Sequence, residues 1–403
     1  MSLTREQNEL LCRIENGAPM GQMLRNNFWF PVALSQKLVA DGAPLKVRLL
    51  GEDFVAFRST DGRLGFFDEK CPHRGASLLL ARNEDNALRC IYHGWKYSVT
   101  GEVVEVPTEP VNAAAFCKKV PLNHYSVREA AGVVWVWIGK GQPKPFPEFE
   151  FNSLPDDQVY VSKQLVNCNW VQDVEGGMDS AHVGILHQAW IQQARLGATT
   201  DDMAPVYDFD ETAGGYRYAA IRNAAGGKKH LRINEYVLPW YSFICPDENN
   251  EGDRLTIMST PIDDENTFHW LVRYNPHRPL SPSLQNPAEN PDDFPPGTGG
   301  AANRWGQDRG MMMRGHFSGF GHLNTEDFAA CESQGAIADR SKEFLNSGDL
   351  AVVRLRRLLL DLVREHQATE GNSSGFPHDS MDYHRVRAHV DTVKDESVWK
   401  SIR

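Results

Sequence analysis

Two short pairs of cysteine and histidine constrain this chain more than any other feature of its sequence. Cys71 and His73 are separated by one residue, Cys90 and His93 are separated by two, and residues 74–89 lie between the pairs. Thiolates and imidazoles are ligands that soft and borderline metals prefer. A glycine follows each pair closely, and glycine lets the backbone approach a metal centre and turn its amide N–H groups toward sulfur. The two pairs therefore predict one metal centre held by two loops.

Zinc and a [2Fe–2S] cluster can both be bound by two thiolates and two imidazoles. Finger-type zinc sites usually separate the first ligand pair by about two to four residues and place the last ligands on a helix. Here one residue separates the first pair, and strand-forming segments surround both pairs. A cluster with two cysteines on one iron and two histidines on the other is the Rieske arrangement. The segments CPHRGASL and CIYHGWKY resemble the Rieske signature. This resemblance assigns Cys71 and Cys90 to one iron and His73 and His93 to the other, with Trp95 packed over the cluster.

Turn residues and prolines divide the chain into two predicted domains. A helix begins near Thr4, which forms a capping-box pattern with Gln7, and short strand-forming segments separated by turns follow from about 28 to 140. A proline-rich segment indicates a linker near residue 150. We therefore expect residues 1–150 to form an antiparallel β domain with an N-terminal helix, and residues 151–403 to form the second domain.

The second domain has a mixed pattern. Residues 169–187 and two segments after residue 324 predict helices, and four longer segments between residues 216 and 276 predict strands of one antiparallel sheet. Residues 280–301 are rich in Pro, Gly and Asn and predict a long loop. The expected fold class is α+β, with an antiparallel sheet flanked by helices in the second domain.

Charge and hydropathy exclude several classes of protein. The 403 residues carry 42 Lys and Arg against 53 Asp and Glu, a formal charge of −11 at pH 7. Surfaces for nucleic acid or anionic membranes need a basic face, and no apolar run approaches the roughly 20 residues that span a bilayer. The N-terminus lacks a signal-peptide pattern, and 7 cysteines are too few for a disulfide scaffold. We expect a soluble, cytoplasmic protein that binds neither nucleic acid nor membrane.

A second group of metal-binding side chains lies in the predicted helix at residues 169–187. Asp179 and His182 are three residues apart, so they share one face of a helix. His182 and His187 are five apart, and an undistorted helix, which turns about 100° per residue, would not make them converge. A π-type bulge or a frayed end near Gly184 would bring both imidazoles to one point. Two imidazoles and one carboxylate form the facial triad of non-haem Fe(II) oxygenases.

The carboxylate of such a triad must come from a distant part of the chain. The candidates are five acidic residues: Asp308, Glu326, Asp327, Glu332 and Asp339. We choose Asp327, because it lies at the start of the predicted helix N-T-E-D-F-A-A-C-E and would point inward with Ala330 and Cys331.

Both halves of the chain resemble the α subunits of Rieske non-haem iron ring-hydroxylating oxygenases, and among them the phthalate 4,5-dioxygenase-like group. The resemblance covers nearly the whole chain and is carried by GEDFVAFRSTDGRLGFFDEKCPHRGASLL, CIYHGWKYSVTGEVVEVPTEP, NWVQDVEGGMDSAHVGILH and TEDFAACESQGAIADRSKEFLNSGDLAVVRLRRLLL. The family motif D-x-x-H-x(4)-H falls on Asp179, His182 and His187, and its late D-x(4)-E falls on Asp327 and Glu332. The family implies a helix-grip-like catalytic domain.

The resemblance also implies how the two centres cooperate. A separate reductase, carrying a flavin and a [2Fe–2S] cluster, takes electrons from NADH and passes them to the Rieske cluster, which delivers them singly to mononuclear Fe(II), where O2 reacts. The working pair of centres spans two subunits of a homotrimer or a dimer of trimers. Asp179 matches the catalytic aspartate that bridges an iron-ligand histidine, here His182, to a cluster histidine, the partner subunit's His93. Many relatives have Gln before the late aspartate, whereas this chain has Glu326.

The resemblance further implies an aromatic carboxylate, such as a phthalate or a substituted benzoate, as the substrate. An anion bound by a chain of charge −11 needs local cations, and Arg222 and Arg232 lie on predicted strands of the catalytic sheet. Ser180, next to the bridging aspartate, is a further candidate contact. The expected reaction is cis-dihydroxylation. Monooxygenation or oxidative O-demethylation would use the same metal sites.

Two alternatives from other classes remain open at the level of sequence. A Rieske electron-transfer protein would have the cluster without mononuclear iron, and a zinc-binding module would have neither a reducible cluster nor colour. Iron and sulfide analysis with electron paramagnetic resonance of the reduced protein distinguishes all three.

Overall fold

The computed structural model describes residues 2–193, 199, 201–246, 250–281, 300–371, 376 and 380–402. The chain divides into two compact units. Residues 25–144 form the first, called here the β unit, and residues 1–24 together with 145–403 form the second, called the sheet–helix unit. Most of the expected loop at residues 280–301 lies outside the described residues.

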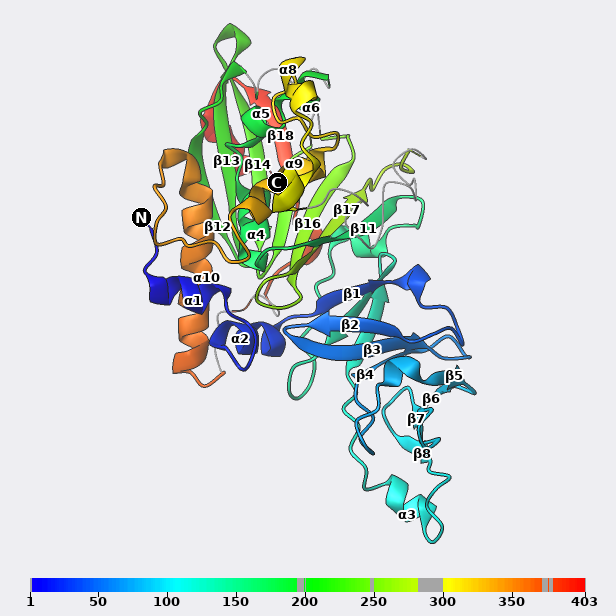
Figure 1. Ribbon diagram of the computed structural model, residues 1–403. Helices are drawn as coiled ribbons and strands as arrows, with labels where there is room; N and C mark the ends of the chain where they lie inside the picture. Colours follow the sequence, from blue (N-terminus) through cyan, green and yellow to red (C-terminus); the bar gives the residue numbers. More distant parts are fainter. Residues whose placement is uncertain are drawn as a thin grey trace. The chain divides into compact units, whose positions relative to one another are not determined.

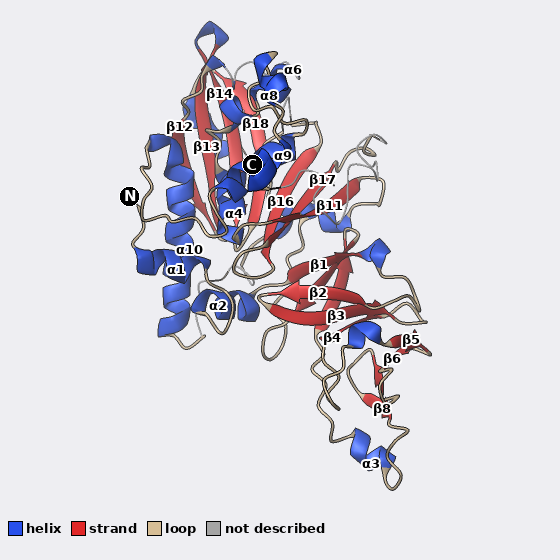
Figure 2. Cartoon of the chain, in the orientation of Figure 1, coloured by secondary structure: helices blue, strands red, loops and turns tan. Residues whose placement is uncertain are grey.

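Three small antiparallel sheets make up the β unit (Figures 1 and 2). The strands of these sheets are β1 (Phe30–Leu34), β2 (Leu45–Leu49), β3 (Glu52–Arg58), β4 (Leu64–Asp68), β5 (Arg82–Glu84), β6 (Ala87–Arg89), β7 (Lys96–Ser98), β8 (Val103–Glu105), β9 (Ser126–Ala130) and β10 (Val133–Trp137). They are ordered β1-β10-β9, β2-β3-β4 and β5-β6-β7-β8. One helix, α3 (Ala113–Cys117), follows β8. The antiparallel β architecture that the short, turn-bounded segments predicted is therefore present.

One eight-stranded antiparallel sheet organises the sheet–helix unit. Its strands are β11 (Val159–Val166), β12 (Val206–Thr212), β13 (Gly215–Ala224), β14 (Lys228–Val237), β15 (Tyr241–Ile244), β16 (Arg254–Pro261), β17 (Thr267–Tyr274) and β18 (His389–Val393). The order is β11-β17-β16-β15-β14-β13-β12, and β18 pairs with β14. Side chains alternate between the two faces of each strand, so one face of this sheet can line a site while the other is packed.

Helices complete the sheet–helix unit. They are α1 (Arg5–Cys12), α2 (Pro19–Asn27), which ends in the β unit, α4 (Trp170–Met178), α5 (Val183–Leu186), α6 (Gln188–Gln193), α8 (Arg309–Met313), α9 (Leu323–Ser333) and α10 (Leu350–Ala368). Helix α4 crosses one face of the sheet against β15, β16 and β17, and α9 packs beside α4 (Figure 1). None of the helices in the described part of the chain is both long and apolar enough to cross a bilayer.

The N-terminal helix belongs to a different unit from the one expected. Thr4 and Gln7 form the predicted capping box of α1, but α1 packs on α10 and not in the β unit. Leu11 and Cys12 are buried there, and the Asn8 side chain donates a hydrogen bond to the carbonyl of Ala338. The expected division into 1–150 and 151–403 is corrected accordingly: the apolar side of α1 is buried against distant segments, and the unit boundary lies at residue 145.

The predicted helix at residues 169–187 is also corrected. Helix α4 ends at Met178, Asp179 adopts an extended backbone conformation, and the four-residue α5 follows. A Cβ at Gly184 would lie 2.5 Å from the carbonyl oxygen of Thr199, so only glycine lets α5 approach that segment. The helix breaks before His182, and the two histidines then flank the short α5, so no bulge within one long helix is present.

Candidate metal centres and substrate pocket

The two predicted cysteines occupy matching loops of the β unit. Cys71 and Cys90 are buried, with exposed fractions of 3% and 2%, and each begins a turn after a strand. In both turns a glycine amide donates to the cysteine carbonyl, from Gly75 at 2.9 Å and from Gly94 at 3.0 Å. Both glycines have positive φ, +71° and +74°, a conformation that other residues rarely adopt. The glycines after the two pairs thus close the loops.

The histidines of the two loops face each other. The ring centroids of His73 and His93 are 4.4 Å apart, and Trp95 stacks on His73 at 4.4 Å with an interplanar angle of 10°. Nδ1 of His93 is buried and has no hydrogen-bond partner among the described residues. Burial raises the pKa of the Cys90 thiol, while the amide N–H groups of Tyr92 and His93 act in the opposite direction. Two buried sulfurs, amides directed at sulfur and an unsatisfied ring nitrogen fit a Rieske cluster.

The second group forms where α4 ends. His182 precedes α5 and His187 follows it, and their ring centroids are 5.1 Å apart. Asp327, on α9, completes a group whose ligand atoms all lie within 4.8 Å of one another. Oδ1 of Asp327 is 3.0 Å from Nε2 of His187 and 3.6 Å from Nε2 of His182. Two imidazoles and one carboxylate that converge in this way fit a mononuclear iron with open positions.

The other candidate carboxylates are engaged elsewhere. Asp308 caps α8 through the amides of Gly310 and Met311, and Asp339 pairs with Lys342. Glu332 accepts hydrogen bonds from Asn167 and from the indole of Trp305. Glu326 faces Nδ1 of His187, on the other side of the ring from Asp327. Among these five, Asp327 is the carboxylate that faces both imidazoles.

Two further carboxylates hold the outer nitrogens of the imidazoles. Oδ2 of Asp179 is 3.4 Å from Nδ1 of His182, and Oε2 of Glu326 is 2.6 Å from Nδ1 of His187. Burial alone would lower the pKa of His187, but the hydrogen bonds to Asp327 and Glu326 outweigh it and raise the pKa to about 9. Each imidazole of the triad therefore has a carboxylate near Nδ1 as well as near Nε2.

A cavity of about 380 Å³ lies beside the triad, between α4, α9 and the sheet. Its lining includes all three triad residues, the predicted Ser180 and Arg232, and the apolar side chains Ile244, Leu255, Ile257 and Leu271. Arg222 is absent from the lining. It is buried, and its guanidinium donates to the carbonyl oxygen of Ser180 at 2.7 Å and to the hydroxyl at 3.4 Å. Arg222 therefore holds the turn after α4, which its position on a predicted strand did not indicate.

Arg232 has the features of an anion-binding residue. Its exposed fraction is 4%, and the described residues form no hydrogen bond or ion pair with its guanidinium, of which Nε is buried. Arg254, which also lines the cavity, is ion-paired with Glu150. A buried guanidinium without an acceptor is costly, and a carboxylate bound in the cavity would satisfy Arg232.

Two of the polar cavity residues that sequence reasoning missed lie on the same strand. His269 and Arg273 lie four residues apart on β17 and line the cavity with Leu271 between them. Nδ1 of His269 is 3.0 Å from Oδ1 of Asp173, whereas Arg273 makes no ion pair within the described residues. The sequence did contain a signal for these residues. His269, Leu271 and Arg273 occupy every second position of a predicted strand, so the three share one face of it.

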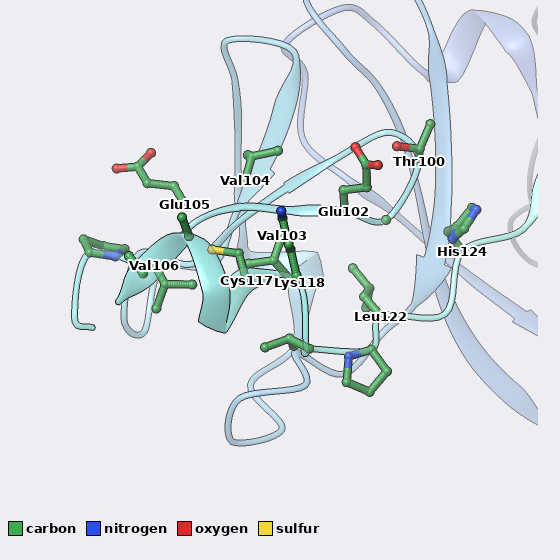
Figure 3. A pocket seen from close by; sticks show the side chains of 16 residues that line it. Thr100, Glu102, Val103, Val104, Glu105, Val106, Cys117, Lys118, Leu122 and His124 are labelled. Atoms are coloured by element: carbon green, nitrogen blue, oxygen red, sulfur yellow. The ribbon is translucent and has the colours of Figure 1, made fainter. Parts of the chain in front are cut away.

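Another cavity, of about 850 Å³, lies in the β unit between the β8 segment and the segment that follows α3 (Figure 3). Val103, Glu105, Cys117 and Leu122 are among the residues that line it. It includes none of the predicted ligands or substrate contacts.

Comparison with protein families gives one match for each half of the chain. Residues 28–122 match the Rieske [2Fe-2S] domain, and residues 136–403 match the family described as LigXa C-terminal domain like. The second match alone covers more than half of the 403 residues.

Curated relatives match almost the whole chain. The phthalate 4,5-dioxygenase oxygenase subunit of Pseudomonas putida is 40% identical over 392 residues, which cover 91% of this chain and 88% of the relative. The 3-chlorobenzoate-3,4-dioxygenase oxygenase subunit of Comamonas testosteroni is 34% identical, with 91% of this chain and 90% of the relative covered. The 5,5'-dehydrodivanillate O-demethylase oxygenase subunit of a Sphingobium species is 29% identical, with 89% and 80% covered.

Solved structures share the fold. The terminal oxygenase of carbazole 1,9a-dioxygenase from Novosphingobium sp. KA1 aligns with a TM-score of 0.61 at 22% identity, over 89% of this chain and 98% of that one. The fold, the two matched domains and the curated relatives all point to one class of oxidoreductase. The oxygenase subunits of this class use a Rieske [2Fe–2S] cluster and mononuclear iron, for which this chain has a matching group of side chains. It belongs to the Rieske non-haem iron oxygenases, in the group that includes the phthalate 4,5-dioxygenase oxygenase subunit.

Proposed function

We propose that this oxygenase subunit hydroxylates an aromatic carboxylate, with cis-dihydroxylation as the reaction and a phthalate or substituted benzoate as the substrate. One observation carries the proposal. The cavity beside the triad combines apolar side chains with Arg232, a buried guanidinium that forms no ion pair with the described residues. The relatives named for phthalate and 3-chlorobenzoate dioxygenation agree with an anionic aromatic substrate.

The ligand assignment is part of the proposal. Cys71, His73, Cys90 and His93 bind the Rieske cluster, and His182, His187 and Asp327 bind the mononuclear iron. When bound, these groups supply single-electron transfer and O2 activation. The chain itself supplies the geometry: two imidazoles from the ends of α5 and one carboxylate from α9 converge at the edge of a cavity that admits a small aromatic ring.

Arg232 and the floor of the cavity orient the substrate. Ile244 and Leu255 are neighbours on β15 and β16, and Leu255 pairs with Arg273 on β17. An aromatic ring over these apolar side chains has Arg232 on β14 at one side and Arg273 at the other. A bidentate bond between a guanidinium and a carboxylate fixes both position and orientation. The carbon atoms that face the triad are then the ones that react.

Electron delivery requires partners. We propose a separate NADH-dependent reductase, and a homotrimer in which Asp179 bridges His182 to the partner subunit's His93. Solved relatives include carbazole oxygenases in complex with a ferredoxin, which supports an external iron–sulfur donor. A requirement for NADH places the reaction in the cytoplasm.

The test is turnover of phthalates, benzoates and their neutral methyl esters under 18O2 with a matched reductase, analysed by mass spectrometry. We expect products with two labelled oxygens from a carboxylate substrate, and little turnover of its ester. Arg232→Gln should raise KM for the carboxylate by about 10- to 100-fold, because a charge-assisted pair worth roughly 1.5–3 kcal/mol is lost. Arg364→Gln, a change of a half-exposed arginine on α10, is the matched control. Equal turnover of acid and ester, or an unchanged KM in Arg232→Gln, would contradict the proposal.

Oxidative O-demethylation is the second candidate reaction, because one relative that covers 89% of this chain is named for it. It would use the same cavity with a methoxy group facing the triad. Methoxybenzoates in the same panel distinguish the two reactions, since demethylation releases formaldehyde and leaves a phenol with no added ring oxygens.

A further inference from the structure

A buried carboxylate next to the triad has a role that neither the ligand set nor the substrate pocket explains. Glu326 precedes Asp327 on α9 and has an exposed fraction of 0%. Its Oε2 lies 2.6 Å from Nδ1 of His187, and its Oε1 accepts a hydrogen bond from the hydroxyl of Ser318. Both oxygens therefore have a partner, and no Lys or Arg in the described part of the chain forms an ion pair with this carboxylate.

The two histidines of the triad are held unequally. Glu326 approaches His187 at 2.6 Å, in an environment where both side chains are almost completely buried. Asp179 approaches His182 at 3.4 Å, with each side chain 24% exposed, and its Oδ1 accepts the Ala181 amide at 2.7 Å. The short, water-excluded contact belongs to His187 alone.

The geometry sets the protonation of His187. A carboxylate within hydrogen-bond distance of Nδ1 requires that this nitrogen carries the proton and donates it. Nε2 lies 3.0 Å from Asp327 Oδ1 and is the nitrogen that would bind a metal placed between His187 and Asp327, because Glu326 engages Nδ1. A hydrogen bond to a carboxylate is stronger than one to a neutral amide and makes the imidazole a better ligand.

We propose that Glu326 is a positioning residue that fixes the tautomer and orientation of His187 and so strengthens iron binding, with Ser318 holding the carboxylate in place. Glu326 does not bind iron in this arrangement. It acts through His187. A glutamine at this position would have the same shape but no charge, so Glu326→Gln isolates the contribution of the charge. The inference rests on the proposed ligands His187 and Asp327.

Iron affinity of the cluster-containing protein tests the inference without any need for turnover. Dissociation constants for Fe(II) are measured anaerobically by competition with a chelator, and the EPR signal of the reduced cluster monitors the integrity of the β unit. We expect Glu326→Ala to weaken iron binding by about 10- to 100-fold, the usual effect of losing a partner of a ligand histidine. Glu326→Gln, which keeps a hydrogen-bond acceptor, should weaken it by less. Glu332→Gln changes another buried carboxylate of α9 and should bind iron like the wild type.

A second measurement remains informative if Glu326→Ala does not fold. In 15N-histidine-labelled protein with Zn(II) in the mononuclear site and an oxidised cluster, NMR should detect a protonated Nδ1 on His187. In Glu326→Gln this resonance should move upfield, because the hydrogen bond is weaker.

The inference is overturned if Glu326→Gln binds iron like the wild type and leaves the Nδ1 resonance of His187 unchanged, or if Glu332→Gln weakens iron binding as much as the Glu326 variants do. Asp327→Ala in the same assay tests the underlying ligand assignment. If it keeps full iron affinity, the proposed iron site fails. If it loses iron while the Glu326 variants do not, only the role of Glu326 fails.

Discussion

Among the side chains around the triad, Asp179 is the one that would contact two imidazoles. It lies between α4 and α5, its Oδ1 is held by the amide of Ala181, and its Oδ2 faces Nδ1 of His182. Burial would raise the pKa of Asp179, but the hydrogen bond from His182 and the nearby amides outweigh it and lower the pKa. Asp179 is therefore an ionised acceptor that can orient His182 and, in the proposed trimer, a second imidazole.

Asp179→Asn should keep both metal centres and nearly abolish turnover. The amide matches the carboxylate in size but can accept through one atom only, so it cannot hold two imidazoles as hydrogen-bond donors. Iron content and the EPR signal of the cluster measure the first expectation, and substrate-dependent NADH oxidation with the reductase measures the second. Near-wild-type activity would disprove the bridging role.

The pKa of His230 reflects the positive charge of the arginines near the cavity beside the triad. It lies two residues before Arg232 on β14, and Nδ1 is 3.3 Å from the hydroxyl of Thr392. Burial, followed by the charges of Arg232 and Arg222, lowers the pKa of His230 to about 4. The folded protein therefore keeps His230 neutral at pH values where the unfolded chain, with a pKa of about 6.5, takes up a proton.

This difference makes folding stability depend on pH. As the pH falls from about 6.5 toward 4, the unfolded state binds the extra proton and stability decreases, by about 1 kcal/mol at pH 5.5. His230→Asn should remove this contribution, so its thermal midpoint should fall less between pH 7 and pH 5.5 than that of the wild type. Equal decreases in the two proteins would show that His230 is not held neutral.

At the level of single residues, the sequence predicted some side chains of the site and missed others. The C-x-H, C-x-x-H and D-x-x-H-x(4)-H patterns are local, so these motifs and their resemblance to a known family grouped Cys71 with Cys90 and His182 with His187. The pairing of Glu326 with His187 had no local signal, because it depends on how α9 packs against the turn after α4. Arg222 was misinterpreted for a related reason: a strand residue can point at a ligand or at a backbone turn, and only the tertiary structure decides.

Among the secondary-structure elements, α4 positions the site, because it packs directly on the sheet and both histidines of the triad follow its C-terminal end. Two successive glycines near its end face different neighbours. A Cβ at Gly177 would lie 2.9 Å from Oγ and 3.1 Å from Cβ of Ser242 on β15, whereas a Cβ at Gly176 would make an ordinary contact of 3.5 Å with Cys331. Glycine disfavours a helix, yet Gly177 is what lets α4 pack closely on β15.

Gly177→Ala and Gly176→Ala should therefore have different effects on folding stability. Alanine favours a helix over glycine by about 1 kcal/mol, so Gly176→Ala should raise the thermal midpoint or leave it unchanged. Gly177→Ala should lower stability by about 1–3 kcal/mol, the usual cost of overpacking, in spite of the same gain in propensity. Scanning calorimetry of the holoproteins measures both. Equal midpoints for the two variants would contradict the close packing of α4 on β15.

At the scale of the whole molecule, patterning predicted the class of each unit but not the path of the chain between them. Alternation and turn residues indicated the antiparallel sheets, and the capping box indicated α1. No local pattern revealed that α1 packs on α10, or that Asp264 accepts the amides of Ile14 and Glu15. Such long-range contacts depend on the complete fold, and for the same reason a carboxylate far along the chain had to be chosen by its helix position.

The central claim is that one chain holds a Rieske cluster and a separate iron on His182, His187 and Asp327. Iron and acid-labile sulfide analysis of the wild type and of Asp327→Ala, with EPR of both after reduction, tests it most directly. We expect about three irons and about two sulfides per wild-type chain, with a rhombic signal of low average g. Asp327→Ala should keep the signal and the sulfide and retain about two irons, the number in the cluster alone. A wild type with only the cluster iron, or an Asp327→Ala protein that keeps the additional iron, would contradict the account.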